Sequence, residues 1–420
     1  MRLANYRYSL ALTSQFYYCG LPLRLDSYSR CHFNCVYCFA SARGGFRGNR
    51  RLKAANADAL RRRLEKLRTT SPNSVVDEFL ARKQPIHLGG VSDPFIQLDA
   101  ESKITLGLLR VLADHQYPTV ISTKGDLFQR SEYLEVLKRG KCIVQISVSS
   151  MDSSLAAMVN VGTPEPSALV HAAKLLSAEG VPVACRIQPL LPTREPDALE
   201  VVDAVASAGV RHVAVEYLKL PVETSWWGTS RLSKSLGVNL HDYYSHRDAR
   251  RVGREWILPP QYRLEWIMRL RERVHSRGLS FGAADNDLLL LSDGDCCCSG
   301  IDLFEGFQEF YRFNYVEAIR SGEATNQVTI SALDRIWHPK RSISQYINSH
   351  SRIHDSQPQG TGIRRYIEHN WNGSLNGNSP EALFGVADTG ESDDRGFRIY
   401  ALSDEVRFLL RQRLHGSTRR

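Results

Sequence analysis

The chain has 420 residues, of which 42% are hydrophobic, and a formal net charge of +9 at neutral pH. These values predict a soluble globular protein with an ample core, organised as one large domain and a smaller one or as two to three domains. No run of about 18 apolar residues occurs, which excludes a transmembrane helix, and the first residues lack the apolar core of a signal peptide. We therefore expect a cytoplasmic protein with reduced thiols and no membrane partner.

The positive charge comes mostly from arginine, whose planar guanidinium suits contacts with phosphate. Such a balance is compatible with a nucleic-acid partner, and equally with a basic soluble enzyme. Residues 1–20 form an N-terminal extension in which we expect Cys19 to be a buried thiol.

A strand expected over residues 21–28 leads into the most informative stretch of the chain. Cys31, Cys35 and Cys38 follow one another at C-x3-C-x2-C spacing. A loop this short can wrap three thiolates around one corner of an iron–sulfur cluster, and three ligands leave the fourth iron open for a small molecule. A zinc site is the alternative, in which His32 would compete as a ligand.

The next segment, residues 41–53, is rich in glycine and arginine and contains one aromatic residue, Phe46. It would lie near the mouth of the site, where it could follow a phosphate backbone or remain a solvated loop. Residues 54–70 then show a helical pattern with a basic face.

Strands and helices alternate from here on. Strands are expected at 85–90, 118–123, 141–149, 181–188, 211–218 and 279–283, and helices near 100–115, 131–139, 164–179, 195–208 and 260–277. This alternation predicts an α/β fold with a parallel sheet and crossover helices. Six to seven units fall short of a closed eight-unit barrel, so we expect an open, partial (β/α)6-type TIM barrel over residues 21–300, with a small, mainly helical C-terminal region over 301–420.

Chemistry in such folds collects at the C-terminal ends of the strands. That rule selects polar or glycine positions after the second to fifth strands: Gly89, Gly90, Asp93, Thr123, Lys124, Ser147, Ser149 and Arg186. Arg186 stands among apolar residues and needs a partner if it is buried.

The cysteine spacing and the aromatic residue before the last cysteine resemble the radical S-adenosylmethionine (radical SAM) superfamily. The resemblance implies a 4Fe–4S cluster on Cys31, Cys35 and Cys38, with SAM bound to the open iron. It also implies cleavage of SAM to a 5′-deoxyadenosyl radical that abstracts hydrogen from a substrate, and an electron donor such as flavodoxin or ferredoxin.

The same resemblance assigns expected SAM contacts. Tyr37 would lie by the adenine, and Gly89-Gly90-Val91 is similar to a Gly-Gly-Glu element that binds the SAM amino group. Because Val91 replaces the acidic residue, the backbone or Asp93 would have to make that contact. Among the other residues at strand ends, Thr123 or Lys124 could contact the SAM carboxylate, which could also pair with Arg186, and Ser147 and Ser149 could contact the ribose hydroxyls.

Tyr-Cys-Phe-Ala at 37–40 and Leu-Gly-Gly-Val-Ser-Asp-Pro-Phe at 88–95 look like the spore photoproduct lyase-like branch, also described as DNA repair photolyase-like. The resemblance covers roughly residues 20–220. Phe39 replaces a tyrosine of those enzymes, and no cysteine occurs between Cys38 and Cys142 to serve as their hydrogen donor. The resemblance therefore implies the fold and the radical chemistry, and not the substrate.

Three consecutive cysteines, Cys296, Cys297 and Cys298, follow the last expected strand. One thiol could donate hydrogen to a substrate radical, one or two could bind a second cluster or metal, or all three could be buried structural thiols. Neighbouring side chains diverge, so the three cannot easily reach one metal from one face.

An irregular insert is expected at 220–258, with Trp226, Trp227 and a run of arginines. It is either a lid over the barrel or a surface that stacks on bases and binds phosphate. We expect a radical SAM enzyme that acts on nucleic acid. The alternatives are the same chemistry on a peptide or small metabolite, and a non-catalytic, metal-stabilised nucleic-acid-binding protein.

Overall fold

The computed structural model describes residues 3–13, 15–42, 51–344, 360–373 and 378–413. The chain divides into two compact units, the first made of Met1–Leu10, Arg24–Arg63 and Ile86–Leu279, and the second of Ala11–Leu23, Leu64–Pro85 and Ser280–Arg420. The domain boundaries expected from the sequence, 1–20, 21–300 and 301–420, stay a prediction. Residues 43–50 of the glycine- and arginine-rich segment lie outside the described residues.

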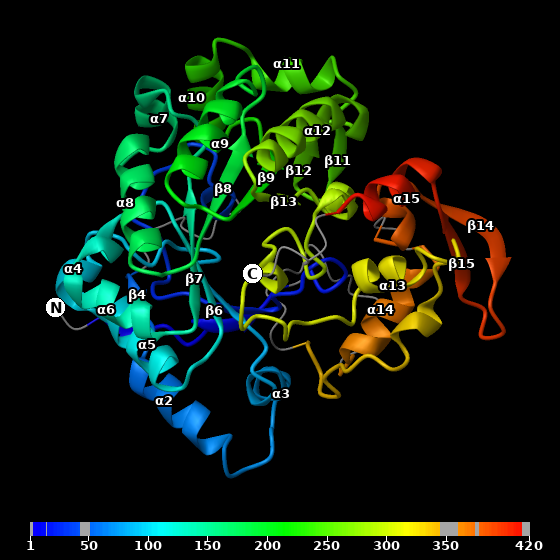
Figure 1. Cartoon of the computed structure of the whole chain (residues 1–420), viewed down its shortest axis with the longest axis horizontal. Helices are drawn as coiled ribbons and strands as arrows, with labels where there is room; N and C mark the ends of the chain where they lie inside the picture. Colours follow the sequence, from blue (N-terminus) through cyan, green and yellow to red (C-terminus); the bar gives the residue numbers. More distant parts are fainter. Residues whose placement is uncertain (1–2, 14, 43–50, 345–359, 374–377, 414–420) are drawn as a thin grey trace. The chain divides into compact units, whose positions relative to one another are not determined.

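The first unit is built on a mostly parallel sheet (Figure 1). Its strands follow one another in the order β9-β8-β7-β6-β5-β3, and the four pairs from β5 to β9 are parallel. They are β3 (Leu23–Leu25), β5 (Ile86–Leu88), β6 (Thr119–Thr123), β7 (Cys142–Ser147), β8 (Val183–Leu190) and β9 (His212–Tyr217). All of β6 and most of β7 are buried, as expected for β-branched strands covered on both faces.

The helices between these strands confirm the predicted α/β alternation. They are α5 (Ile104–Asp114), α6 (Ser131–Arg139), α8 (Pro166–Ala178) and α9 (Asp197–Ser207), and α12 (Pro260–Ser276) follows β9 and the insert. The helix expected at 100–115 is in fact two, because Lys103 has a φ of 53° between α4 (Asp99–Ser102) and α5. A further helix, α7 (Ser153–Val159), was not predicted; Asp152 caps it by accepting from the amides of Ser154 and Leu155.

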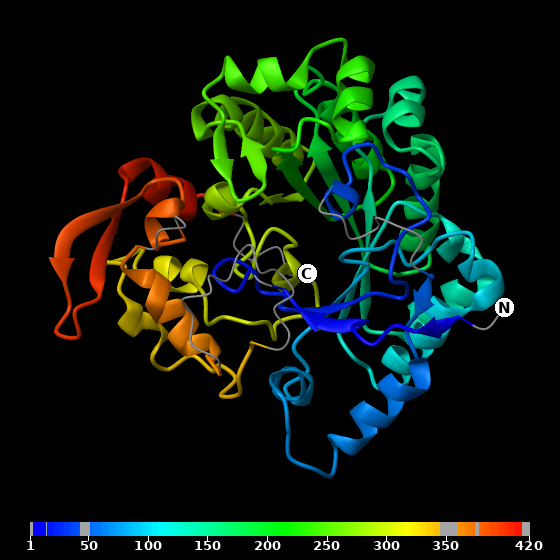
Figure 2. The ribbon, with the colours of Figure 1, turned by 180° about the vertical axis from the view of Figure 1, so that it is seen from behind.

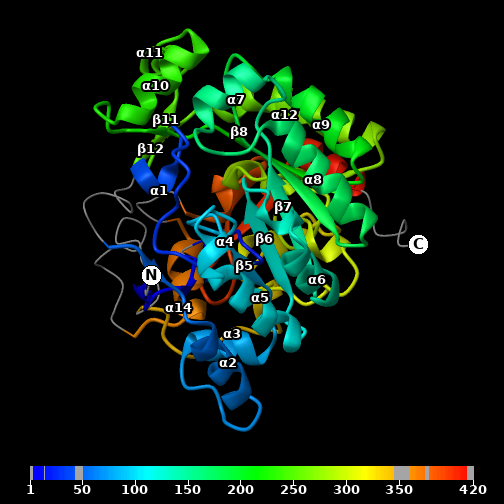
Figure 3. The same ribbon diagram turned by 90° about the vertical axis from the view of Figure 1, so that its left-hand side faces the viewer.

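The insert at 220–258 is not irregular, so that expectation was wrong. It forms an antiparallel sheet in the order β10-β12-β11, with β10 (Leu220–Pro221), β11 (Arg250–Val252) and β12 (Glu255–Ile257). Two helices, α10 (Trp227–Leu236) and α11 (Leu240–Ser245), lie beside one another in this insert (Figure 3), and α10 also contacts α7. The remaining elements of the N-terminal part are β1 (Ala4–Asn5), α1 (Phe39–Ala42), β4 (Lys53–Ala54) and α2 (Ala57–Lys66).

The second unit has a core of aromatic side chains. Tyr17 stacks on Tyr315 and Tyr366, with ring centroids 5.1 and 4.8 Å apart, and Phe16 meets Tyr366 edge to face. The C-terminal region contains the expected helices and also a β-hairpin, β14 (Val386–Ser392) with β15 (Arg398–Leu402), drawn in orange to red in Figure 2. The other elements are β2 (Leu10–Leu12), α3 (Val75–Ala81), β13 (Ser280–Ala283), α13 (Tyr315–Ser321), α14 (Ile363–Trp371), α15 (Asp404–Arg411) and the short 3₁₀ helices η1 (Leu127–Gln129), η2 (Asn286–Leu291), η3 (Ile301–Leu303), η4 (Ile330–Leu333) and η5 (Pro380–Ala382). Among the residues that the structure describes, no helix is long and apolar enough to cross a membrane.

Candidate functional site

Three thiols of the first unit face one cavity. Cys31, Cys35 and Cys38 line a cavity of about 640 Å³ together with neighbouring loop residues and Trp227 at the start of α10. Cys31 and Cys38 are partly exposed, whereas Cys35 is 8% exposed. The C-x3-C-x2-C spacing predicted that the three thiols bind one cluster, and the structure brings them to one cavity.

The loop that carries these thiols is held by backbone contacts. The amide of Asn34 donates to the carbonyl of Val161 (2.9 Å), and the amide of Val36 donates to the carbonyl of Val159 (3.0 Å) at the end of α7. On its other side, Gly228 of α10 packs so closely that a Cβ there would lie 2.2 Å from the Val36 carbonyl oxygen. This packing places Trp227, the residue before Gly228, in the cavity wall.

The three thiols are the donor type that iron–sulfur clusters use. No group of three or more His, Cys, Asp or Glu in the described part of the chain is arranged to hold one metal ion. Ligands of a cluster each bind a different iron, and these three thiols line one cavity. Burial raises the pKa of all three thiols, that of Cys35 to about 11, and so favours their neutral form.

Asp93, in the loop that follows β5, accepts hydrogen bonds from the end of β6 and the residue after it. Its carboxylate accepts hydrogen bonds from the Thr123 hydroxyl (2.8 Å) and from the amides of Lys124 (2.5 Å) and Phe95 (2.9 Å). Burial raises the pKa of Asp93 and lowers that of Lys124. The Lys124 ammonium lies 5.4 Å from the ring centroid of Tyr37. Tyr37, Asp93 and Lys124, which the sequence analysis selected from three separate segments, therefore lie close together.

The side chain of Tyr37 is fixed by a residue that the sequence did not reveal. Its hydroxyl donates to the Oδ1 of Asn160, and the Asn160 Nδ2 donates to the Ser149 hydroxyl (3.1 Å). Asn160 follows α7 immediately, and no local motif points to it. The structure therefore joins two expected contact residues, Tyr37 and Ser149, through a third.

A row of polar side chains crosses four neighbouring strands. His87 on β5 lies 2.7 Å from the Ser122 hydroxyl, which donates to Gln145 Oε1 (3.0 Å), and Arg186 on β8 donates to the same oxygen (3.4 Å). The Nε of Arg186 is buried, and no described residue offers it a hydrogen-bond acceptor. A buried guanidinium nitrogen in that state is suited to an anionic ligand group. Ser147 lies opposite Arg186 in the pairing of β7 with β8.

Gly89 and Gly90 are required by the packing of the protein itself. Gly89 has a φ of 89°, and a Cβ there would lie 2.4 Å from the Ser122 carbonyl oxygen. A Cβ on Gly90 would lie 2.8 Å from the Arg24 side chain. Their contact with SAM stays a prediction, as do the SAM contacts of the other selected residues.

Comparison with known proteins identifies the segment that contains the site. Residues 26–205, which contain the cysteine loop, Asp93, Lys124 and Arg186, match the family model described as the Radical SAM superfamily. This segment is a radical SAM domain. The match to this family implies that a 4Fe–4S cluster and SAM are the cofactors of this domain.

Individual relatives of the radical SAM domain were also found. An uncharacterized protein of Mycobacterium bovis and one of Mycobacterium tuberculosis are each 29% identical over 198 residues, which cover 46% of this chain and 56% of the relative. The chain thus spans about half the length of the curated relatives it matches. A spore photoproduct lyase complexed with dinucleoside spore photoproduct has a similar fold, with a TM-score of 0.50 at 13% identity over 65% of this chain and 78% of that one.

The three consecutive cysteines belong to the second unit. Cys296 and Cys297 are buried and Cys298 is partly exposed. They do not contribute to the cavity wall that the cysteine loop lines. Their expected roles as hydrogen donor or as ligands of a second metal site stay predictions.

Proposed function

We propose that this protein is a radical SAM enzyme that modifies or repairs nucleic acid, with an open (β/α)6-type partial barrel as its catalytic domain. The observation that carries the proposal is the wall of the cysteine cavity, which presents Phe33, Trp227 and Arg30 beside the three thiols. Aromatic rings next to cations suit a nucleotide, because a base stacks on the ring and phosphate pairs with the cation.

Each part of the site has a task in this proposal. When bound, the cluster and SAM supply an electron and the 5′-deoxyadenosyl radical that abstracts hydrogen from the substrate. The three loop thiols bind the cluster, and the Nε of Arg186 binds the carboxylate of the cofactor. Asp93 holds the strand end that carries Thr123 and Lys124, and the Asn160 amide orients Tyr37.

Trp227 provides the stacking surface for the substrate. It is 43% exposed although it is large and apolar, and the guanidinium of Arg231, one turn further along α10, lies 5.4 Å from its ring. Such an exposed ring with a flanking cation is more useful to a planar ligand than to the stability of the fold. A lid role for the insert is compatible with the same placement, because Trp227 of the insert lines the cavity.

Electron delivery and location complete the proposal. The cluster would be reduced by a small redox protein such as flavodoxin or ferredoxin, in the cytoplasm, where reduced thiols suit cluster assembly.

Binding of single-stranded oligonucleotides tests the substrate class. Stacking on an aromatic side chain is worth about 1–3 kcal/mol per base, so Trp227→Ala should weaken binding by about 5- to 150-fold. Trp266→Ala is the matched control, because Trp266 also carries an arginine, Arg269, at 4.9 Å but lies on α12 and not in the cavity wall. Binding should fall steeply with salt. Equal effects of both variants, or no salt-dependent binding by the wild type, would exclude nucleic acid in favour of a peptide or small metabolite.

A further inference from the structure

Four thiols from two distant segments meet in the second unit. Cys19 and Cys298 both form side-chain hydrogen bonds with Cys297, and the sulfur of Cys296 lies 3.7 Å from that of Cys297. The hydroxyl of Ser299 is 3.1 Å from the Cys297 sulfur as well. Cys297 is therefore the centre of this group, which we call the thiol group.

The two segments that form the thiol group are packed without space between them. A Cβ on Gly20 would lie 2.9 Å from the Cβ of Cys296, so only glycine allows the approach. The amide of Leu21 donates to the Cys19 sulfur at 3.3 Å, which fixes the position of that thiol. The contact between Cys19 and Cys297 thus follows from the backbone and not from a chance side-chain rotamer.

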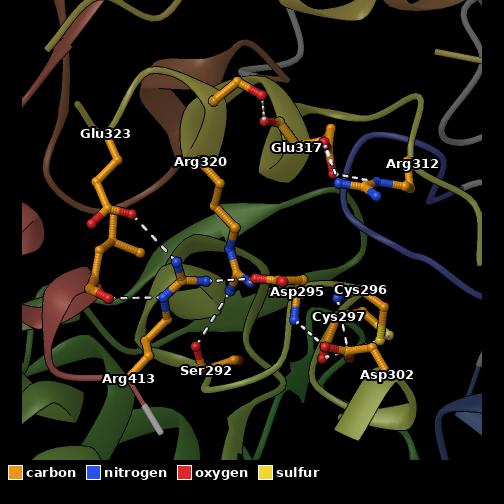
Figure 4. Close-up of polar contacts among 12 residues, drawn as sticks. Ser292, Asp295, Cys296, Cys297, Asp302, Arg312, Glu317, Arg320, Glu323 and Arg413 are labelled. Carbon is orange, nitrogen blue, oxygen red and sulfur yellow. Dashed lines mark hydrogen bonds and ion pairs between the residues drawn. The ribbon is translucent and has the colours of Figure 1, made fainter. Parts of the chain in front are cut away.

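The loop around Cys296 and Cys297 is fixed by charged side chains (Figure 4). The carboxylate of Asp302 accepts from the amides of Asp295 (2.7 Å) and Cys296 (3.3 Å). Asp295 in turn pairs with Arg320 (2.5 Å) and Arg413 (2.6 Å). A loop held at this many points keeps the sulfur of Cys297 in place beside its neighbours.

Hydrogen bonding distributes the charge unevenly within the thiol group. Bonds from Cys19, Cys296 and Cys298, in that order of strength, lower the pKa of Cys297 well below its usual value. The bond to Cys297 raises the pKa of Cys19, and burial raises that of Cys296. Cys297 is therefore the most acidic of the four thiols, and the thiolate is the form in which a cysteine sulfur is oxidised.

The arrangement suits a sulfur–sulfur bond better than a metal ion. The sulfurs of the thiol group contact one another directly: the Cys296 sulfur lies 3.7 Å from that of Cys297, and Cys19 also bonds to Cys297. Cys19 and Cys298 are partly exposed, so a small solute can approach although Cys297 is buried. Two adjacent cysteines such as Cys296 and Cys297 form a disulfide only with strain, which leaves Cys19 as the partner from another segment.

We propose that Cys297 and Cys19 form an oxidation site that reacts with hydrogen peroxide and closes into a disulfide. The Cys297 thiolate attacks one peroxide oxygen and breaks the O–O bond; with one proton from solvent this gives a sulfenic acid and water. The Cys19 thiol then attacks the sulfenic sulfur, forms the S–S bond and releases a second water. Two electrons pass from the two sulfurs to the peroxide, and the cross-link joins residues 11–23 to the loop at 293–302.

Peptide mapping of the full-length holoenzyme tests the proposal. The protein is exposed to increasing peroxide, quenched, denatured, alkylated and digested with trypsin without reduction. Cys19 lies in the tryptic peptide 8–24, the thiol group's other cysteines in 278–312 and the cluster ligands in 31–43, so each set is observed separately. We expect peptides 8–24 and 278–312 to become linked with the loss of two hydrogens. Internal controls are Cys142 and Cys185, whose pKa values burial raises to about 12; they should be oxidised at least about tenfold more slowly.

Serine variants identify the reacting sulfur. Cys297→Ser should abolish the link between the two peptides, whereas Cys298→Ser and Cys296→Ser should retain it. The proposal fails if peptide 8–24 stays unlinked, or if the link persists in Cys297→Ser. It also fails if the purified protein carries zinc or additional iron that Cys19→Ser removes and that protects the thiol group from peroxide. None of these outcomes depends on the proposed action on nucleic acid.

Discussion

Replacing Gly228 by alanine should displace the cysteine loop, although Gly228 lies on the neighbouring helix α10 and not in the loop. Gly228 is in the first turn of α10, and the new methyl carbon would lie 2.2 Å from the Val36 carbonyl oxygen and 2.4 Å from the Trp226 ring. Such contacts are essentially never shorter than 3.0 Å, so the backbone of Val36 or the start of α10 has to move by about 0.8 Å. Val36 lies between two of the three cluster thiols, which will move with it.

The structure sets the size of the expected effect. Overpacking of this kind costs about 1–3 kcal/mol of the free energy of unfolding, which a domain of this size tolerates. A displacement near 1 Å at a reacting centre costs about 100-fold in rate. We therefore expect Gly228→Ala to fold but to bind less iron and to release 5′-deoxyadenosine from SAM at least about tenfold more slowly.

The matched control is Gly237→Ala at the other end of the same helix. Gly237 has a φ of 68° with no atom within 4 Å of the added Cβ. Alanine there costs about 1 kcal/mol through backbone strain alone, and should leave iron binding intact. Iron per chain, urea unfolding and SAM cleavage are measured on both variants. The reasoning is refuted if Gly228→Ala keeps as much iron and cleaves SAM as fast as Gly237→Ala.

Two further predictions concern stability. Burial favours the neutral form of Asp295, but Arg320 and Arg413 outweigh burial and hold the pKa of Asp295 below its usual value. The wild type should therefore be more stable than Asp295→Asn at pH 7. The difference between their urea midpoints should disappear as pH falls below about 4, where Asp295 becomes protonated. A gap that does not change with pH would contradict the ion pairing. Tyr28→Phe removes a donor from the buried carboxylate of Asp99 and should lower the free energy of unfolding by about 1.5–3 kcal/mol; a loss below 0.5 kcal/mol would show that the pair adds little.

The parts of the site that the sequence predicted are those with a local signal. The three cysteines are close together in the chain, and Asp93, Lys124 and Arg186 each follow or lie in a strand whose apolar run was visible. Parallel strands present their C-terminal ends on one side of the sheet, so these residues could be predicted to lie near one another. The family match over 26–205 supports their role in radical SAM chemistry.

The parts that were missed depend on contacts between distant segments. Asn160 reaches Tyr37 across more than a hundred residues, and nothing near it in sequence marks that bond. Cys19 was expected to be a buried thiol, yet it is partly exposed and bonded to Cys297. The insert was predicted to be irregular because strands of two or three residues, such as β10 and β11, are too short for a periodic pattern.

The central claim concerns what Cys31, Cys35 and Cys38 hold, and one anaerobic measurement tests it most directly. The reconstituted wild-type protein and Cys35→Ala are incubated with SAM and dithionite, and iron and 5′-deoxyadenosine are determined for both. We predict about four irons per chain at the loop and release of 5′-deoxyadenosine by the wild type, and neither in the variant. Zinc in place of iron at these thiols, or equal release by Cys35→Ala, would contradict the account.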